Sequence, residues 1–255
     1  MRRLLVALIC ALFHVTPALA QTPVIACAAD LKFALEEIAS HFQHDTNHEI
    51  KLVFGSSGNF YRQILQGAPF QMFMSADEDF VFKLAQAGQT LDRGDLYALG
   101  RIGIFVPQGS PLKPDGGLTD LAAALTDGRL RRFAIANPEH APYGRRAEEA
   151  LKHAGLWERI KSKLVLGENV SQAAQFATSD SAQGGIIAYS LARAPAVARL
   201  GQFALISDAW HEPLKQRMVL LKNAGNTAKE FYKYMRQPSA RAIMRRYGFT
   251  LHATQ

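Results

Sequence analysis

The sequence predicts an α/β protein with two lobes. Short apolar runs alternate with segments of helical periodicity, a pattern typical of βαβ units and of a largely parallel sheet. A glycine- and proline-rich stretch, residues 108–117, interrupts the alternation, and a second α/β set follows it. Of the 255 residues, 48% are hydrophobic and 20% are charged, a composition that supports a folded core and argues against disorder.

In the first set, every predicted strand except the last leads into a predicted helix. Leu31, Leu35, Ile38 and Phe42 recur at helical spacing after the first strand, and Asp30 stands where a helix cap is favoured. The predicted strands are residues 24–28, 50–54, 70–74 and 102–107, and the predicted helices begin near residues 31, 60 and 77.

The second set is predicted to follow residue 117. It holds helices at residues 119–125, 145–155 and 171–177 and strands at residues 133–136, 184–188, 203–206 and 218–221. The chain closes with amphipathic helices that carry Phe231, Met235, Ile243 and Tyr247. We expect these helices to return to the first lobe, so that residues 21–100 and 212–255 form lobe 1 and residues 101–211 form lobe 2.

The first twenty residues have the layout of a secretory signal peptide. Arg2 and Arg3 give a basic start, residues 4–13 are apolar, and residues 18–20 read Ala-Leu-Ala, a small-x-small cleavage site. The apolar run is shorter than the roughly 20 residues that a membrane span needs. The sequence therefore predicts export to the periplasm with cleavage after Ala20.

Charge and cysteine content restrict the function further. The formal net charge is +7, or +5 once Arg2 and Arg3 leave with the signal peptide, and the basic residues are spread out rather than clustered. No nucleic-acid partner is expected from such a distribution. Cys27 is the one cysteine of the predicted mature chain and lies in an apolar run, so we expect a buried structural thiol and no intrachain disulfide.

Four turns share one local pattern, in which an apolar strand passes through a few small residues into a helix. Such turns place the unpaired N–H groups of a first helical turn at the carboxyl end of a strand, which is where open α/β sheets bind ligands. These amides and the positive end of the helix dipole suit a small anion. Two turns fall in each lobe, so closure would surround a ligand with uncharged donors. The turns are residues 28–30, 55–58, 141–144 and 168–170.

Several stretches within these turns and elsewhere carry a family resemblance. They are Gly55-Ser56-Ser57-Gly58, Arg62-Gln63-Ile64, Gly67-Ala68-Pro69, Ser75-Ala76-Asp77, residues 137–144 (NPEHAPYG), Gly155-Leu156-Trp157, Glu168-Asn169-Val170 and Arg246-Tyr247-Gly248-Phe249. Through them, essentially the whole mature chain resembles the molybdate-binding periplasmic component of ABC transporters, which has a type II periplasmic-binding-protein fold.

The resemblance implies a function. The chain would be a monomer that captures molybdate or tungstate and delivers it to an ABC-transporter permease, with no cofactor of its own. No nucleophile–base pair is visible, so an enzyme is not predicted. A periplasmic sensor that passes its ligand to a receptor remains an alternative.

The resemblance also implies which residues contact the ligand. Ser57 matches a serine contact, Val170 matches a backbone N–H contact, and Tyr143 stands where family members have Ala or Tyr. Ala29 belongs to the contacting turn after the first strand. Ser57, Tyr143 and Val170 would touch the oxygens around molybdenum rather than the metal itself. From the residues alone, Ser57 could instead cap its helix, and Tyr143 could simply pack at the lobe interface.

Two positions depart from the family pattern. Ala188 stands where many members place a tyrosine, and Tyr189 follows one residue later. Asp30 stands where the family has Ser or Asn, and a carboxylate about 4 Å from another unit negative charge costs about 4 kcal/mol at an effective dielectric constant near 20.

Three interpretations of Asp30 follow. In the first, the carboxylate caps its own helix. In the second, it accepts a hydrogen bond from a protonated ligand, or its charge is balanced by Arg62 or Arg145. In the third, the ligand is a cation or a neutral polar molecule instead of molybdate.

Histidines near the end of the first predicted helix give no separate signal. His41, His44 and His48 lie at the helix end and in the loop beyond it. A zinc site needs three or more converging ligands in a fixed geometry, so we interpret these side chains as solvated.

Overall fold

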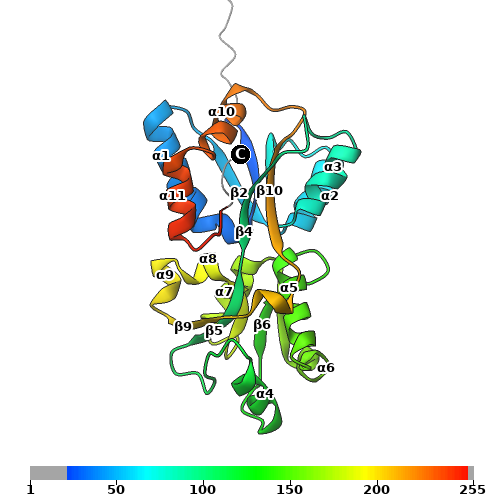
Figure 1. The fold of residues 1–255 in the computed structure, drawn as a ribbon, viewed down its shortest axis with the longest axis vertical. Coiled ribbons are helices and arrows are strands. Elements are labelled where there is room, and N and C mark those ends of the chain that lie inside the picture. Colours follow the sequence, from blue (N-terminus) through cyan, green and yellow to red (C-terminus); the bar gives the residue numbers. More distant parts are fainter. Residues whose placement is uncertain (1–21, 252–255) are drawn as a thin grey trace, which may run out of the picture.

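The computed structural model describes residues 22–251 and confirms the predicted α/β fold with two lobes (Figure 1). The predicted signal peptide lies outside these residues. Within them, the strands form two five-stranded sheets, one in each lobe. No helix in the described part is long and apolar enough to cross a membrane.

The sheet of the first lobe has the strand order β2-β1-β3-β10-β4. Strand β1 lies between β2 and β3 and is parallel to both, whereas β10 runs antiparallel to its neighbours β3 and β4. The sheet is therefore mixed rather than wholly parallel. Its strands are β1 (Val24–Ala28), β2 (Lys51–Gly55), β3 (Met72–Ser75), β4 (Asp95–Gly100) and β10 (Leu214–Leu220).

Helices cover both faces of this sheet (Figure 1). On one face, α1 packs beside the C-terminal helix α11, and on the other α2 packs beside α3. Leu35, Ile38 and Phe42 are fully buried on α1, and Phe42 meets Phe231 of α10 edge-to-face. These elements are η1 (Ala29–Leu31), α1 (Lys32–Thr46), α2 (Ser57–Leu65), α3 (Glu78–Gln86), α10 (Asn226–Tyr234) and α11 (Pro238–Arg246).

The sheet of the second lobe has the order β7-β6-β8-β5-β9. Strand β6 is parallel to β7 and β8, whereas β5 is antiparallel to β8 and β9. The strands are β5 (Ile102–Pro107), β6 (Phe133–Ala136), β7 (Leu164–Gly167), β8 (Gly185–Ala188) and β9 (Gly201–Leu205). The helical elements are α4 (Thr119–Thr126), α5 (Pro142–His153), α6 (Trp157–Ile160), η2 (Lys161–Lys163), α7 (Val170–Ala177), α8 (Tyr189–Ala192), α9 (Pro195–Ala198) and η3 (Asp208–Trp210).

The chain passes between the two sheets at two places. Arg101 alone separates β4 of the first sheet from β5 of the second, and residues 206–213 lead back from β9 to β10. Two short crossings of this kind are suited to a hinge. The residue boundaries predicted for the lobes stay a proposal.

Most predicted elements occur near their predicted positions. Strands β5 and β6 have the predicted bounds, while helix α5 begins three residues earlier than predicted, at Pro142. Proline is favoured in the first turn of a helix because its missing N–H would have no partner there. Strands β4 and β7 are absent from the prediction.

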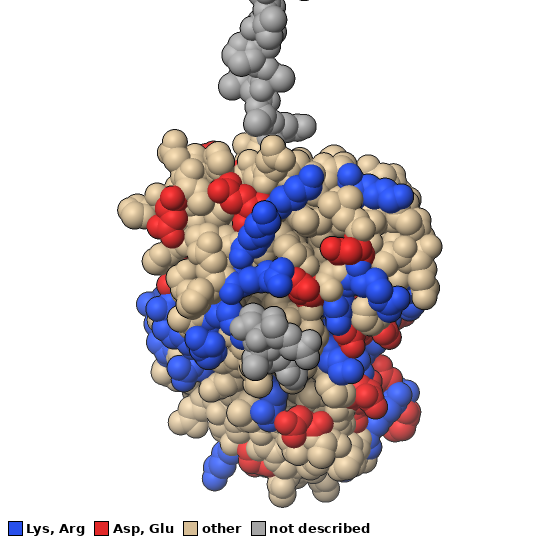
Figure 2. All heavy atoms as spheres, turned by 45° about the horizontal axis from the view of Figure 1, so that its top comes forward, with Lys and Arg blue, Asp and Glu red and all other residues tan. Residues whose placement is uncertain are grey.

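On the face that Figure 2 shows, lysine and arginine side chains lie over much of the surface, and several of them adjoin one another. Lysine and arginine side chains are interspersed there with aspartate and glutamate. This distribution agrees with the spread-out basic excess of the sequence.

Candidate functional site

A small pocket lies where the two lobes meet, and residues of both lobes line it. It contains about 190 Å³ of space that no atom fills, part of which is open to solvent. Of the described residues that line it, none is Lys, Arg or His, so the pocket offers no cationic side chain. The lining residues are Ala28, Ala29, Asp30, Gly55, Ser56, Ser57, Ala76, Ala141, Pro142, Tyr143, Asn169 and Val170.

The serine turn before α2 contributes Ser57, whose side chain is 1% exposed. Ser56, not Ser57, caps the helix: its Oγ accepts from the Asn59 amide at 3.3 Å. The hypothesis that Ser57 is a helix cap is therefore wrong. Its Oγ instead accepts from the Ala76 amide at 3.0 Å, which leaves the hydroxyl proton of Ser57 available to another acceptor.

The same turn connects the lobes. The Gly58 amide donates to the carbonyl of His140 in the second lobe at 3.0 Å. The amides of Gly58 and Asn59 therefore both have acceptors. The Ser57 amide is the remaining N–H of the first turn of α2, and the helix supplies no acceptor at this position.

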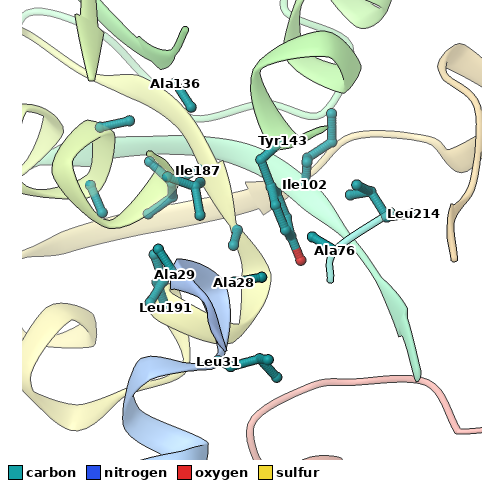
Figure 3. Close-up of a cluster of buried hydrophobic side chains, with 14 of the residues drawn as sticks. Ala28, Ala29, Leu31, Ala76, Ile102, Ala136, Tyr143, Ile187, Leu191 and Leu214 are labelled. Carbon is teal, nitrogen blue, oxygen red and sulfur yellow. The ribbon is translucent and has the colours of Figure 1, made fainter. Parts of the chain in front are cut away.

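The turn before α5 contributes Tyr143. The cap residue Ala141 offers no side-chain acceptor, and Pro142 at the first helical position has no N–H. The Tyr143 amide is therefore the first donor of this helix. The Tyr143 side chain is 3% exposed and extends from α5 (Figure 3).

The turn before α7 contributes Val170, which is 3% exposed. The Asn169 side chain accepts from the amides of Ser171 and Gln172 and so caps the helix. The amide of Val170 lies at the first helical position, where the helix supplies no acceptor. In addition, the Ser171 hydroxyl donates to the Ala29 carbonyl of the first lobe at 2.8 Å, which positions the Ala29 turn against α7.

Asp30 is fully enclosed in the wall of this pocket, at 1% exposure. Its Oδ2 accepts from the Tyr143 hydroxyl at 2.9 Å and from Gln216 Nε2 at 2.7 Å. Its Oδ1 has no hydrogen-bond partner among the described residues. Neither η1 nor α1 has a side-chain cap. The hypothesis that Asp30 caps its own helix is therefore wrong.

A buried polar network fixes the donors to Asp30. Tyr97 donates to Gln216 Oε1 at 2.8 Å, which turns the amide nitrogen of Gln216 toward Asp30 and Tyr143. The Ser190 hydroxyl donates to the Asp30 carbonyl at 2.8 Å. Partners that are themselves held by hydrogen bonds keep the buried Asp30 side chain in one orientation.

Burial raises the pKa of Asp30 from 3.8 to about 6, although the hydrogen bonds from Gln216 and Tyr143 and the proximity of its own backbone N–H offset part of the effect. Burial, with a contribution from the Asp30 charge, also raises the pKa values of Tyr97 and Tyr143 well above their usual range. Both tyrosines therefore remain neutral donors at any physiological pH.

No arginine balances Asp30 in the described part of the chain. The Arg62 side chain contacts Asn59, whereas Arg145 donates to the Pro138 carbonyl at 3.2 Å and lies over the Phe80 ring. The hypothesis that Arg62 or Arg145 compensates the carboxylate is therefore wrong.

Ala188 does not line the pocket, in contrast to the expectation from the family pattern. It is fully buried at the end of β8, and its methyl side chain has no polar group. The following Tyr189 stacks on Phe203 with ring centroids 5.5 Å apart, so its hydroxyl does not replace the missing tyrosine. Of the six predicted contacts, Ala29, Asp30, Ser57, Tyr143 and Val170 converge on the pocket, and Ala188 does not.

Gln216 is the functional side chain that the sequence prediction missed. It is fully buried, and it shares one face of β10 with Leu214 and Met218, which are also buried. Alternate residues of a strand lie on the same face, and a polar residue on a buried face needs a buried hydrogen-bond partner. That alternation is the signal that would have identified it.

The described residues contain no group of three or more His, Cys, Asp or Glu side chains that could hold a metal ion. Asp30 is the one carboxylate among the described residues that line the pocket. Cys27 is a buried free thiol whose pKa is raised by burial, as expected for a structural cysteine.

Comparison with known proteins identifies related chains. The family described as bacterial extracellular solute-binding protein matches residues 23–250. The molybdate-binding protein ModA of Rhodobacter capsulatus is 34% identical over 91% of this chain and 90% of its own length. The protein of the same name from Azotobacter vinelandii is 34% identical over 89% of each chain.

The fold has a solved counterpart. The periplasmic molybdate-binding protein of Azotobacter vinelandii superposes with a TM-score of 0.81 at 29% identity, covering 91% of this chain and 100% of that one.

Proposed function

This chain belongs to the bacterial extracellular solute-binding protein family, and on that premise we propose that it captures molybdate for uptake by an ABC transporter. Relatives that are 34% identical over about nine tenths of both chains carry the name molybdate-binding protein. The chain would act in the periplasm, as a monomer, and would deliver its ligand to a membrane permease. Tungstate, as a tetrahedral oxyanion of similar size, would be an alternative cargo.

One observation carries the proposal: three helices from the two lobes begin at residues that line the same small pocket. Ser57, Tyr143 and Val170 lie in the first turns of these helices, where an amide has no acceptor within its helix, and no described residue of the lining has a cationic side chain. Amides at helix N-termini bind small anions through hydrogen bonds and the helix dipole. A site of uncharged, fixed donors selects its ligand by size and by the number of oxygens.

Contacts between the lobes support a capture mechanism. Gly58 binds the His140 carbonyl, and Ser171 binds the Ala29 carbonyl, so the pocket is closed by hydrogen bonds between the lobes. A ligand held between two lobes stabilises the closed form, which a permease can distinguish from the open form.

The test is a thermal-shift panel on the mature chain with molybdate, tungstate, sulfate, phosphate and divalent cations. A ligand at 100 times its Kd stabilises the folded protein by about 2.7 kcal/mol. We expect molybdate and tungstate to raise the melting temperature, and sulfate and phosphate to do so less. A shift with divalent cations alone, and none with any oxyanion, would refute the proposal.

A further inference from the structure

The wall of the anion pocket contains an acceptor that has no donor. Asp30 Oδ1 is buried and accepts no hydrogen bond from the described residues, while Oδ2 of the same carboxyl group already has two donors. A buried acceptor without a partner is costly, and such groups are rare in folded proteins. A hydrogen-bond donor on the bound ligand would therefore satisfy this oxygen.

A fully deprotonated oxyanion cannot be that donor. Molybdate offers only acceptor oxygens, and a charged Asp30 beside it adds charge repulsion. At an effective dielectric constant near 20, the repulsion between two unit charges about 4 Å apart would lower the binding affinity roughly a thousandfold. Adding a proton to a carboxyl group of pKa about 6 at pH 7 costs only about tenfold. Proton uptake is therefore the less costly solution.

We propose that Asp30 couples ligand binding to a proton, which lies between the Asp30 carboxyl group and a ligand oxygen in the closed complex. This inference rests on the proposed function, because it concerns the same oxyanion pocket. With molybdate, the proton comes from solvent and joins Asp30, whose O–H then donates to the ligand. No bond of the ligand breaks, and one proton is taken up for each ligand bound.

Within residues 22–251, no other group that faces Asp30 can take this role. Tyr143, Tyr97 and Cys27 are the titratable groups that interact with it, and all three stay protonated at physiological pH because burial raises their pKa values. His140 contacts Ser56 and Glu168 instead.

The charged side chains of the elements that pack against η1 are exposed or have other partners. On α1, Glu36, His41, His44 and Asp45 are exposed, and Glu37 contacts Arg246. Helix α7 has no titratable side chain. Lys32 of α1 lies over the Phe33 ring, Lys51 of β2 is exposed, and Tyr189 of α8 stacks on Phe203. Asp30 is thus the one group facing this pocket, among the described residues, that changes charge between pH 5 and 8.

The experiment is calorimetric titration of the mature chain with micromolar molybdate at pH 5.5, 6.5, 7.5 and 8.5. Each pH is measured in two buffers that differ in ionisation enthalpy. We expect affinity to fall roughly two-hundredfold from pH 5.5 to pH 8.5, as a carboxyl group of pKa about 6 requires. We also expect the uptake of about one proton per ligand at pH 7.5 and above.

Asp30→Asn is the matched variant, since it keeps the shape and an acceptor oxygen but cannot titrate. It should bind molybdate with an affinity that is independent of pH and with no proton uptake. If Asp30→Asn folds poorly, Asp30→Ser serves the same purpose. Binding to the unmodified chain that is pH-independent and proton-neutral overturns the inference and leaves the proposed function intact. Absence of molybdate binding at every pH, in the chain and in both variants, overturns the proposed function instead.

Discussion

The Tyr143 hydroxyl of the second lobe donates to Asp30 Oδ2 of the first lobe at 2.9 Å, within the wall of the pocket. Gly100, the last residue of β4, makes room for this pair. A Cβ atom at Gly100 would collide with the Tyr143 hydroxyl and lie 2.7 Å from Gln216 Nε2. The contact between the lobes thus depends on a glycine beside the first chain crossing.

Replacing Tyr143 by phenylalanine should destabilise the protein more at high pH than at low pH. At pH 8 Asp30 is mostly charged, and a hydrogen bond to a charged group contributes about 1.5–3 kcal/mol. At pH 5 the carboxyl group is mostly neutral, and the loss should fall to about 0.5–1.5 kcal/mol. Urea unfolding at the two pH values measures the difference.

Tyr247→Phe is the control for Tyr143→Phe, because Tyr247 donates to Glu37 at 3.3 Å in a half-exposed position. Its loss should cost about 0.5 kcal/mol or less. Equal effects of the two substitutions at pH 8 would show that the contact between Tyr143 and Asp30 adds nothing to stability.

The raised pKa of Asp30 predicts how stability depends on pH. The pKa rises from 3.8 in the unfolded chain to about 6 in the folded one, so the folded state binds the proton more tightly. The stabilisation that this proton supplies is complete below pH 3.8 and is lost as pH rises through about 6. The full loss is on the order of 3 kcal/mol.

Asp30→Asn removes this dependence, because the amide does not titrate. The difference in unfolding free energy, variant minus unmodified chain, should increase by about 2.4 kcal/mol between pH 4 and pH 7, which is most of the full loss. Chemical denaturation across this range isolates Asp30, since every other carboxyl group is common to both proteins. A difference that stays flat with pH would mean that the folded and unfolded pKa values are the same.

The sequence predicts the fold where a strand or helix is locally self-consistent. Strand β5 is a continuous apolar run, and its bounds are correct. Strand β4 reads Asp-Leu-Tyr-Ala-Leu-Gly, which follows a turn and contains neither a β-branched residue nor a clear alternation. Pairing with β10 stabilises β4 as a strand although its local β-propensity is weak. A single sequence does not reveal which strand will be its partner.

The site is only partly predictable for a similar reason. The turns themselves follow from local sequence, and the family resemblance selects Ser57, Tyr143 and Val170 within them. The partners of Asp30 do not follow from local sequence, because Gln216 lies 186 positions away along the chain and Tyr143 lies 113 positions away. Only the folded structure shows that Asp30 is a buried carboxyl group with an unpaired oxygen rather than the cap of its own helix.

Ser57→Ala should weaken the pocket in two ways. Its Oγ accepts from the Ala76 amide, so the substitution leaves a buried donor unpaired at a cost of about 1–3 kcal/mol in stability. Loss of the hydroxyl proton as a donor should lower molybdate affinity by a further 0.5–1.5 kcal/mol, or about 2- to 13-fold. Denaturation and calorimetry measure the two effects separately.

Ser171→Ala is the matched control for the affinity effect, since the Ser171 hydroxyl also makes a hydrogen bond to the backbone, in a part-buried position, but Ser171 does not line the pocket. It should reduce stability with a smaller change in affinity. If both serine variants lose the same affinity, Ser57 acts through closure of the lobes rather than through contact with the ligand.

Closure of the lobes depends on the absence of a side chain at Gly58. The Gly58 amide donates to the His140 carbonyl, and a Cβ atom built at Gly58 would lie 2.5 Å from that same oxygen. Because the oxygen belongs to backbone, it cannot move aside as the end of a long side chain can. An alanine here would hold the lobes apart.

Gly58→Ala should therefore lower ligand affinity without loss of stability in the ligand-free chain. Alanine in a helix is favoured over glycine by about 0.5–1 kcal/mol, so the free protein should melt at the same or a higher temperature. Calorimetry should show affinity at least tenfold weaker, and small-angle scattering should show a larger radius of gyration with ligand present. Gly117→Ala is the control, because a Cβ atom there meets only side-chain atoms at 3.3 Å or more. Unchanged affinity in Gly58→Ala would mean that the contact with His140 is dispensable for closure.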